Sequence, residues 1–261
     1  MTFNGKVVAV TGAAGGIGRS LCRCFLDEGA KIAAIDKNAS VDSLAAELKA
    51  TAGTLSSAVA DISEPAEVNA AFATLTSALG PVDILVNNAG GSDHPAFART
   101  DPAGWRREID DNLNGAYYCT HAVIPGMLAK LAGVIISIGS VNGLSALGDP
   151  AYSAAKAAMI SLTRSLAQEY GRFGIRANIV LPGTVRTPLW DRRAAKDPTV
   201  LETLKRWYPL GRIVEPVDVA RAVMFLASDA ASAITGVALP VDCGLTSGNI
   251  VMTRELTLND L

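Results

Sequence analysis

Residues that mark particular protein classes are scarce in this sequence. Its 261 residues include only 4 cysteines and 2 histidines, and aromatic residues make up 5% of the chain. Four scattered cysteines are too few for a disulfide framework, so we expect reduced thiols. Two histidines far apart in the sequence do not form the cluster that a metal ion needs, and we predict no metal site.

Charge of one sign and long apolar runs are also lacking. The 23 basic residues nearly balance the 25 acidic residues, so no overall field favours a nucleic acid or an anionic membrane. No apolar run approaches the roughly 20 residues that span a bilayer, and an apolar segment directly after Lys6 leaves no room for a signal peptide. We therefore expect a cytoplasmic protein with a small-molecule substrate and without nucleic-acid or membrane partners.

Alternation of segment types is the main pattern that is present. The chain is 49% apolar, and short β-branched runs alternate with longer Ala-rich amphipathic stretches. This pattern predicts an α/β fold: a single-domain, Rossmann-type doubly wound parallel sheet of seven strands with helices on both faces. The strands are expected at residues 6–10, 31–35, 55–60, 84–87, 134–138, 176–181 and 237–241. No linker divides the chain, so the single domain is expected to cover residues 1–261.

The stretches between the expected strands predict helices. They are expected at residues 17–28, 41–50, 64–79, 115–129, 152–170 and 216–228. Gly29, Gly80 and Gly171 follow three of these helices, where a C-cap in the left-handed conformation favours glycine.

A glycine-rich turn lies between the first expected strand and the first helix. It reads Thr11-Gly12-Ala13-Ala14-Gly15-Gly16-Ile17-Gly18, and its glycines let the backbone approach a pyrophosphate at a helix N-terminus. Seen alone, such a turn could also be a flexible loop. The second strand ends in Asp36, whose carboxylate can accept hydrogen bonds from both ribose hydroxyls and would repel a 2′-phosphate. This favours NAD over NADP, although Lys37 or Arg19 could reach a phosphate.

Tyr152 and Lys156 lie four residues apart at the start of a long expected helix, so their side chains share one face. A phenol is a poor base at neutral pH, but a neighbouring ammonium favours the phenolate and lowers the pKa toward the working range. Such a pair could take a proton from an alcohol. Seen alone, most pairs with this spacing are ordinary surface neighbours.

Together, the turn and this pair make the chain resemble the short-chain dehydrogenase/reductase family from Lys6 to about Gly244. Further segments are similar to family motifs in the same order. Asp61-Ile62 resembles the acidic step that meets the adenine, and Asn87-Asn88-Ala89-Gly90 resembles the segment beside the cofactor. The nicotinamide-side loop is matched by Pro182-Gly183-Thr184-Val185-Arg186-Thr187.

The resemblance implies a catalytic tetrad of Asn112, Ser140, Tyr152 and Lys156. Tyr152 would be the general base in alcohol oxidation and the acid in carbonyl reduction, while Lys156 would lower its pKa and hold the nicotinamide ribose. Ser140 would orient the substrate oxygen, and Asn112 would hold a water in a proton relay. Seen alone, Asn112 could be a helix cap and Ser140 a turn hydroxyl. The four-residue spacing of Tyr152 and Lys156 disfavours enoyl reductases.

The implied reaction is an NAD-dependent interconversion of an alcohol and a carbonyl by hydride transfer. Thr187 and the backbone of Val185 would hold the carboxamide of the cofactor. The residues expected to bind NAD are Gly12, Gly15, Gly16, Ile17, Gly18, Asp36, Asp61, Ile62, Asn88, Ala89, Gly90, Tyr152, Lys156, Gly183, Val185 and Thr187.

The substrate is expected beyond the carboxyl ends of the strands, where residues 183–215 are long enough to form a lid with its own helices. Arg192 and Arg193 could clamp an oxyanion, or they could form a solvated surface. His94 and Asn142 are further candidates for substrate contact. The chain from Pro150 through Thr187 resembles sugar and polyol dehydrogenases, so we expect a sugar or polyol. Asn142, Ser145 and Asp149 are available near Ser140 to recognise its hydroxyl groups. An anionic sugar is included, such as a sugar acid or sulfoquinovose oxidised at C1.

Two other functions fit the same motifs, and the resemblance also implies an oligomeric state. A 3-oxoacyl-carrier-protein reductase would use the same tetrad, with Lys130 and Arg172 docking an acidic carrier, but Asp36 argues against NADPH. A non-catalytic NAD sensor would bind the cofactor without turnover.

The family resemblance implies a homotetramer formed through the helices that begin near Asn114 and Tyr152. The tail, residues 245–261, is expected either to pack on a neighbour or to fray.

Overall fold

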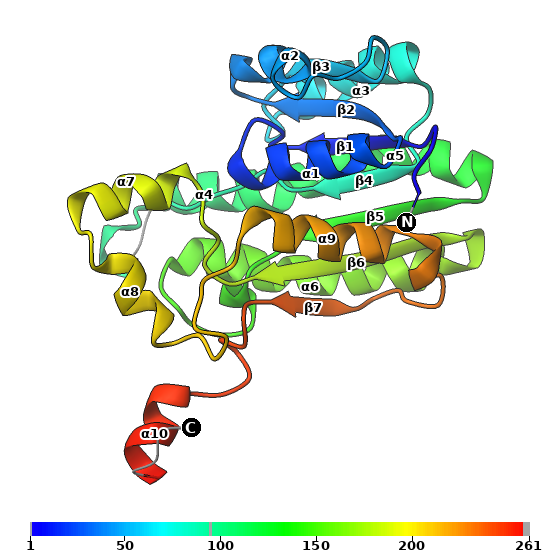
Figure 1. Cartoon of the computed structure of the whole chain (residues 1–261). Helices are drawn as coiled ribbons and strands as arrows, with labels where there is room; N and C mark the ends of the chain where they lie inside the picture. Colours follow the sequence, from blue (N-terminus) through cyan, green and yellow to red (C-terminus); the bar gives the residue numbers. More distant parts are fainter. Residues whose placement is uncertain (1, 94–95, 258–261) are drawn as a thin grey trace.

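A computed structural model describes residues 2–93 and 96–257, and the side chains of Leu189, Asp191 and Arg192 also lie outside the described part. Seven parallel strands form one sheet in the order β3-β2-β1-β4-β5-β6-β7, which confirms the predicted fold class (Figure 1). The strands are β1 (Val7–Thr11), β2 (Lys31–Asp36), β3 (Leu55–Val59), β4 (Ile84–Asn87), β5 (Gly133–Ile138), β6 (Ile175–Pro182) and β7 (Ala238–Val241).

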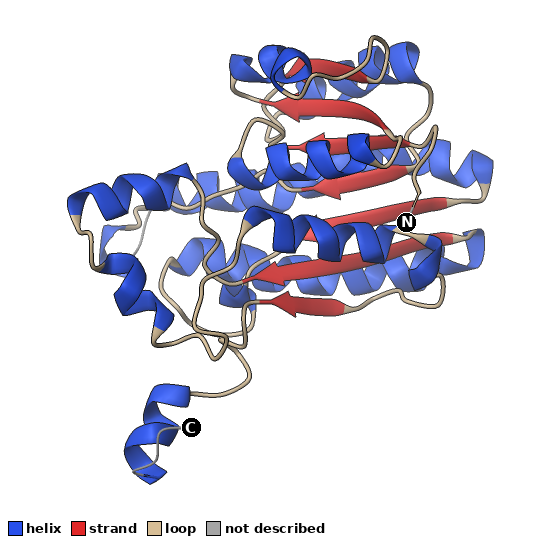
Figure 2. Cartoon of the chain, in the orientation of Figure 1, coloured by secondary structure: helices blue, strands red, loops and turns tan. Residues whose placement is uncertain are grey.

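Helices cover both faces of the sheet (Figure 2). Those of the main body are α1 (Gly16–Asp27), α2 (Leu44–Glu47), α3 (Pro65–Leu79), α4 (Pro102–Ile109), α5 (Gly115–Lys130), α6 (Pro150–Tyr170) and α9 (Pro216–Ala227). Helices α1 and α9 pack on one face, whereas α3, α5 and α6 lie on the other.

The alternation of side chains along β1 explains why the sheet is covered on both faces. Successive side chains of a strand point to opposite sides of the sheet. Val8 and Val10 belong to the core under α1 and α9, whereas Val7 and Ala9 belong to the core under α3 and α5. All of β1 is buried, so both of its faces must be apolar, as its sequence is.

Several details differ from the sequence-based predictions. The helix expected at 41–50 is a 3₁₀ turn, η1 (Ala39–Ser43), followed by the short α2, and α4 was not predicted. Gly29 and Gly80 have the expected positive φ (85° and 98°). The prediction for Gly171 was wrong, because its φ is −56°. A 3₁₀ turn continues the chain there, and Gly174 takes the left-handed conformation instead (φ 73°).

The carboxyl ends of the strands face the segment predicted as a lid. Helices α7 (Pro188–Lys196) and α8 (Val200–Lys205) lie beyond this edge of the sheet (Figure 1). A bridge between Val185 and Val214 closes the base of the segment. Helix α10 (Ile250–Thr257), within the tail, stands away from the sheet.

No helix among the described residues is long and apolar enough to cross a membrane. The four cysteines are free in the structure.

Arg176 on β6 ties this strand to the end of α9. Its guanidinium donates hydrogen bonds to the carbonyl oxygens of Leu226 (2.7 Å), Ser228 (3.1 Å), Ile234 (3.2 Å) and Ala227 (3.3 Å). These carbonyls include the unpaired ones at a helix C-terminus.

We expect Arg176→Met to lower the free energy of unfolding by about 2–3 kcal/mol, because it leaves partly buried carbonyls without donors. Chemical denaturation measures this change. Arg172→Met is the control, since its exposed side chain stacks only on Phe173, and we expect a change of less than about 0.5 kcal/mol. Equal losses in both variants would contradict the capping role.

Candidate active site

The glycine-rich turn after β1 is held by the segment after β4. The Thr11 Oγ1 accepts hydrogen bonds from the backbone N–H of Asn88 and Ala89, both at 3.0 Å. The Asn88 amide donates to the Gly12 carbonyl at 3.1 Å. Gly12 has a left-handed φ of 64°, and a Cβ there would lie 2.8 Å from the Ala89 Cα. A Cβ on Gly18 would lie 2.1 Å from the Gly12 oxygen, so the turn and α1 pack only with glycine at this position.

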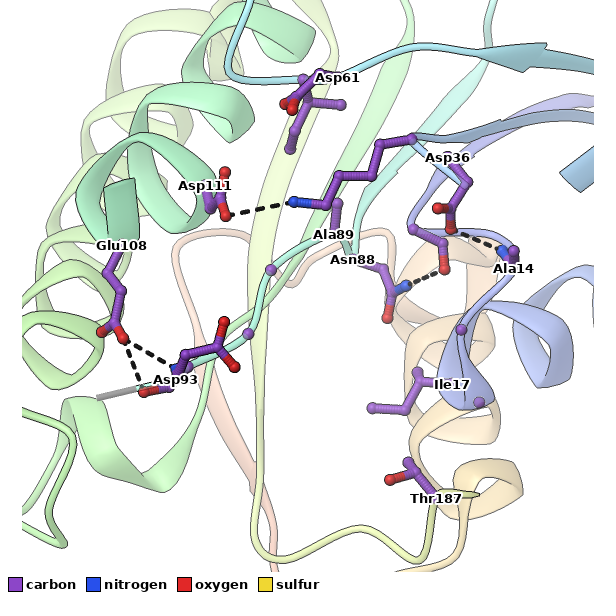
Figure 3. A pocket seen from close by; sticks show the side chains of 18 of the residues that line it. Ala14, Ile17, Asp36, Asp61, Asn88, Ala89, Asp93, Glu108, Asp111 and Thr187 are labelled. Atoms are coloured by element: carbon purple, nitrogen blue, oxygen red, sulfur yellow. Dashed lines mark hydrogen bonds and ion pairs between the residues drawn. The ribbon is translucent and has the colours of Figure 1, made fainter. Parts of the chain in front are cut away.

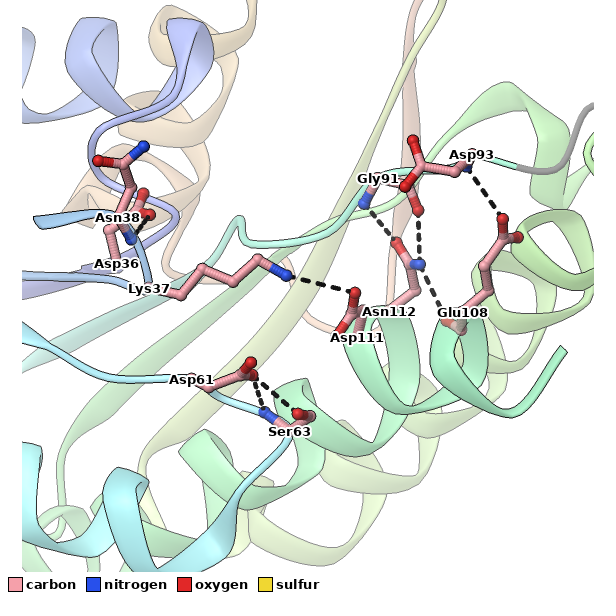
Figure 4. Close-up of polar contacts among 10 residues, drawn as sticks. All are labelled: Asp36, Lys37, Asn38, Asp61, Ser63, Gly91, Asp93, Glu108, Asp111 and Asn112. Carbon is pink, nitrogen blue, oxygen red and sulfur yellow. Dashed lines mark hydrogen bonds and ion pairs between the residues drawn. The ribbon is translucent and has the colours of Figure 1, made fainter. Parts of the chain in front are cut away.

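The carboxylate at the end of β2 is fixed by two backbone groups. Asp36 Oδ2 accepts a hydrogen bond from Ala14 N at 2.9 Å (Figure 3), and Oδ1 accepts one from Asn38 N at 2.8 Å (Figure 4). Each carboxylate oxygen has a further lone pair that can accept from a hydroxyl group. The geometry therefore leaves Asp36 able to bind a ribose.

Both cations that could have reached a 2′-phosphate are paired with carboxylates. Lys37 Nζ lies 3.6 Å from Asp111 Oδ2 across the cleft (Figure 4). Arg19 pairs with Glu47 and also donates to the Ala14 carbonyl at 2.8 Å. Neither cation is therefore an unengaged phosphate ligand.

A cleft of about 720 Å³ runs from the turn to the end of β2, and a smaller hollow of about 240 Å³ continues it toward Tyr152. All residues predicted to bind NAD line one of the two, except Gly18, which packs under the turn. The cradle of glycines, the helix N-terminus and the fixed Asp36 fit a dinucleotide.

Lys156 is almost fully enclosed, with 3% of its surface exposed. Its ammonium donates to the Ile138 carbonyl at 3.0 Å and lies 5.4 Å from the ring centre of Tyr152. Burial lowers the pKa of Lys156 to about 8. The predicted proximity of the two side chains is therefore present.

The predicted direction of the Tyr152 pKa was wrong for the polypeptide by itself. Desolvation raises the pKa of Tyr152 above 10, and the negative charges of Asp149 and Glu108 raise it further. A hydrogen bond with Ser140 lowers the pKa of Tyr152 in part. The low pKa of Lys156 weakens the help that its ammonium can give, because its own charge is partly lost near pH 8.

Asn112 lies in a π-helical turn, η3 (Asp110–Asn114), between α4 and α5. Its Nδ2 donates to the carbonyls of Gly91 (2.8 Å) and Glu108 (2.9 Å), and its Oδ1 accepts from Gly91 N (3.1 Å). Both amide hydrogens are therefore used by the backbone, and a relay water could bind only at Oδ1. The π turn is the kind of local distortion that often marks functional sites.

Ser140 and Asn142 form the substrate side near Tyr152. The Ser140 hydroxyl accepts from Asn142 N at 3.1 Å and donates to Asn142 Oδ1 at 3.3 Å. Asn142 also donates to Ser153 Oγ at 3.3 Å, which ties this turn to α6. Asn142 is thus near the site, as predicted, but its side chain is engaged within the protein.

The expected oxyanion clamp is described only in part. Arg193 is exposed, and its guanidinium stacks 4.6 Å from the ring centre of Trp190, which lines the hollow beside Tyr152. The side chain of Arg192 lies outside the described residues, as does His94.

Sequence reasoning missed an acidic group beside the tetrad. Glu108 is 5% exposed, and its Oε1 accepts from Ser92 Oγ and Asp93 N, both at 3.1 Å (Figure 4). The spacing of four residues between Glu108 and Asn112 indicates a shared helix face, and this signal could have identified it. Asp111, which pairs with Lys37, also escaped the sequence-based prediction.

The arrangement can carry out proton transfer next to a bound dinucleotide. Tyr152 and Ser140 can contact an oxygen of a substrate, and the Lys156 ammonium lies behind the phenol. No group of three potential metal ligands occurs among the described residues.

Comparisons with known proteins agree with this geometry. A family model described as enoyl-(acyl carrier protein) reductase matches residues 12–246. The crystal structure of an oxidoreductase of the short chain dehydrogenase/reductase family from Burkholderia thailandensis is 47% identical and superposes with a TM-score of 0.92, covering 98% of each chain.

Curated relatives extend over nearly the whole chain. An uncharacterized oxidoreductase of Schizosaccharomyces pombe is 44% identical over 259 residues, which are 98% of this chain and 96% of that protein. The 2-(S)-hydroxypropyl-CoM dehydrogenase 3 of Xanthobacter autotrophicus is 37% identical, with 93% and 97% covered. Galactitol 2-dehydrogenase (L-tagatose-forming) of Cereibacter sphaeroides is 39% identical, with 94% and 96% covered.

The chain belongs to the short-chain dehydrogenase/reductase family, as its motifs predicted. It is an oxidoreductase that acts between an alcohol and a carbonyl. Although the matching family model is described as an enoyl reductase, the Xanthobacter autotrophicus and Cereibacter sphaeroides relatives are named as dehydrogenases.

The buried ammonium of Lys156 is expected to lower the stability of the folded protein. A folded-state pKa of about 8, against 10.5 for an ordinary lysine, means that the protonated form is disfavoured in the folded chain. Below pH 8 both states hold the proton and the penalty is complete. Between pH 8 and 10.5 only the unfolded chain holds it, so the penalty disappears as pH rises.

We therefore expect Lys156→Met to raise the free energy of unfolding at pH 7 by on the order of 2 kcal/mol. Denaturant titrations at several pH values measure the gain, which shrinks toward pH 10.5. Exposed Lys6 provides the control, because Lys6→Met leaves the free energy of unfolding almost unchanged. A loss of stability in Lys156→Met at pH 7 would contradict the assignment.

Proposed function

We propose that this protein is an NAD-dependent dehydrogenase that interconverts a hydroxyl group of a sugar or polyol and the corresponding carbonyl. The observation that carries the proposal is the placement of Tyr152, Lys156 and Ser140 at one end of a dinucleotide cleft whose other end is Asp36. The preference for a polyol is supported by the 39% identical galactitol 2-dehydrogenase.

The choice of NAD over NADP rests on charge. The Asp36 carboxylate would repel a 2′-phosphate. Lys37 is paired with Asp111, and Arg19 is paired with Glu47, so neither offers an unpaired charge to a phosphate.

The chain's own residues supply binding and proton transfer. When bound, NAD would accept the hydride from the carbinol carbon. The Ser140 hydroxyl positions the substrate oxygen, and Tyr152 Oη takes the hydroxyl proton in oxidation and returns it in reduction. Below about pH 8, where Lys156 is protonated, its ammonium stabilises negative charge that develops on Tyr152 Oη. Because the pKa of Tyr152 is raised, oxidation is faster at alkaline pH and the protonated phenol is ready for reduction at neutral pH.

We favour a neutral substrate over the anionic sugar also considered. The carboxylates of Glu108 and Asp149 raise the pKa of Tyr152, and negative charge close to the phenol would also repel an anion. This feature supports a polyol without a carboxylate or sulfonate group.

The carrier-protein alternative has less support. Its proposed docking cations were Lys130 and Arg172, yet Lys130 pairs with Asp83 at 2.6 Å and donates to the Val82 carbonyl at 3.0 Å. The non-catalytic sensor predicts cofactor binding without turnover, so kinetics decide it directly.

We also propose a homotetramer in the cytosol. The proposed contacts are along α5 and α6, where Tyr117 on α5 is 49% exposed and α6 presents small residues such as Ala154 and Ala157. Free cysteines agree with a reducing compartment. Light scattering of the purified protein measures the assembly.

A substrate panel tests the proposed function. We expect NADH formation with neutral polyols such as galactitol, and a rate at least tenfold lower with sugar acids or sulfoquinovose. Tyr152→Phe should lower kcat by about 10²–10⁴-fold while calorimetry gives an unchanged Kd for NAD. Turnover that is equal with the charged group present or removed would reject the neutral preference. Cofactor binding without turnover of any alcohol or carbonyl would favour the sensor.

Removal of the carboxylate at the end of β2 tests the cofactor preference. We expect Asp36→Asn to raise the ratio of kcat/KM for NADP to that for NAD by on the order of a hundredfold, because a repulsive charge is lost. Asp42→Asn is the matched control, since Asp42 hydrogen-bonds Ser57 outside the cleft and its loss should leave the ratio unchanged. An unaltered ratio in Asp36→Asn would contradict the assignment.

A further inference from the structure

Two helices of this protein start with the same dipeptide but begin in different ways. Both α4 and α6 begin at a proline that follows an aspartate. Asp101, before α4, has extended backbone, and its carboxylate accepts a hydrogen bond from Gly104 N at 2.6 Å, as an N-cap does. Asp149, before α6, has left-handed backbone (φ 48°, ψ 68°) and makes no capping hydrogen bond. The aspartate before the helix of Tyr152 therefore does something other than capping.

The Asp149 carboxylate turns to the segment after β4 instead. Its Oδ1 accepts a hydrogen bond from Ser92 Oγ at 2.9 Å. The same hydroxyl lies 3.1 Å from Glu108 Oε1, which also accepts from Asp93 N (Figures 3 and 4). A hydroxyl has a single hydrogen, so two carboxylates share one donor at this point.

This contact joins three parts of the site. Ser92 follows β4 beside the cofactor cleft, Glu108 belongs to α4, and Asp149 precedes the first turn of α6. The backbone carbonyl of Glu108 also accepts from the Asn112 amide. Left-handed backbone in a residue other than glycine costs free energy, and the hydrogen bond between Ser92 and Asp149 can offset this cost.

The charges that bear on Tyr152 come from its own helix, from the residue before that helix and from α4. Among the described residues they are Lys156 on the same helix, Asp149 before that helix and Glu108 on α4. The loop after β5 contributes the uncharged Ser140. Both carboxylates raise the pKa of Tyr152, so they oppose formation of the phenolate.

We propose that Asp149, bridged through Ser92 to Glu108, is a positioning residue that fixes the first turn of α6 and keeps a negative charge beside Tyr152. This role sets the pH at which Tyr152 acts as a base, and the inference rests on the proposed function, in which Tyr152 exchanges a proton with the substrate. Asp149 itself touches neither the cofactor cleft nor the hollow beside Tyr152.

The substitution Asp149→Asn removes the negative charge of the side chain but keeps its size. Asparagine keeps an acceptor for Ser92 and tolerates left-handed backbone. The acid limb of the pH profile of kcat/KM for alcohol oxidation should move to lower pH by on the order of one unit. Activity on the acid side of the limb then rises about tenfold. The control is Asp101→Asn, the same change at the other Asp-Pro helix start, and its profile should match the wild type.

A second readout needs no substrate. Ultraviolet difference titration of each protein against its Tyr152→Phe counterpart follows ionisation of Tyr152, and the midpoint should fall in Asp149→Asn. Asp149→Gly, which removes both the carboxylate and the backbone strain, should shift the midpoint in the same direction.

Two results overturn the inference. One is an unchanged midpoint in folded Asp149→Asn, whether or not Asp149→Gly shifts, and the other is an equal shift in Asp101→Asn. If the wild type turns over no alcohol at all, the proposed function fails, but the titration still decides the role of Asp149.

Discussion

An ammonium group that has almost no access to water is the constraint on which this site depends. Lys156 is held by the carbonyl of Ile138 at the end of β5, so the site needs β5 and α6 to meet in a fixed register. The same helix presents Tyr152 one turn earlier, and the ring and the ammonium remain 5.4 Å apart. Burial is unfavourable for the charge, but it places the ammonium beside the phenol, with the Ile138 carbonyl and the Met159 sulfur as further contacts.

Desolvation acts on both members of this pair and favours their neutral forms. It lowers the pKa of Lys156 to about 8 and raises the pKa of Tyr152. The chain alone therefore holds the phenol as a proton donor. In the proposed reaction, groups that enter with the ligands would have to supply the positive charge or the hydrogen bonds that make Tyr152 a base. The polypeptide alone keeps Tyr152 protonated, and bound ligands would have to lower its pKa.

Much of the scaffold could be predicted because it depends on local sequence. Buried parallel strands need continuous apolar, β-branched runs, so β4 was predicted at its observed bounds and the other strands within about two residues. The cofactor cleft could be placed because the glycine-rich turn and Asp36 follow strand ends, whereas the full tetrad came from the resemblance to the family. Helix α4 was missed because its polar residues, such as Arg106 and Arg107, give little apolar periodicity.

The electrostatics of the site could not be predicted in the same way. The direction of the Tyr152 pKa depends on desolvation and on Glu108, whose partner Ser92 lies 16 residues away in sequence. The link from Ser92 to Asp149 spans 57 residues. Sequence spacing identifies the neighbour one turn along a helix, but it does not show which carboxylates the fold brings to the same side chain.

The most direct test of this account is the ionisation of Lys156 itself. Heteronuclear NMR of lysine-labelled protein, with the Lys156 signal assigned by its loss in Lys156→Met, follows the ammonium through a pH titration. The account predicts a midpoint near pH 8 in the protein without ligands. A midpoint near 10.5, the value of an ordinary lysine, would contradict it, because the ammonium would then be solvated and the desolvated pair would not exist.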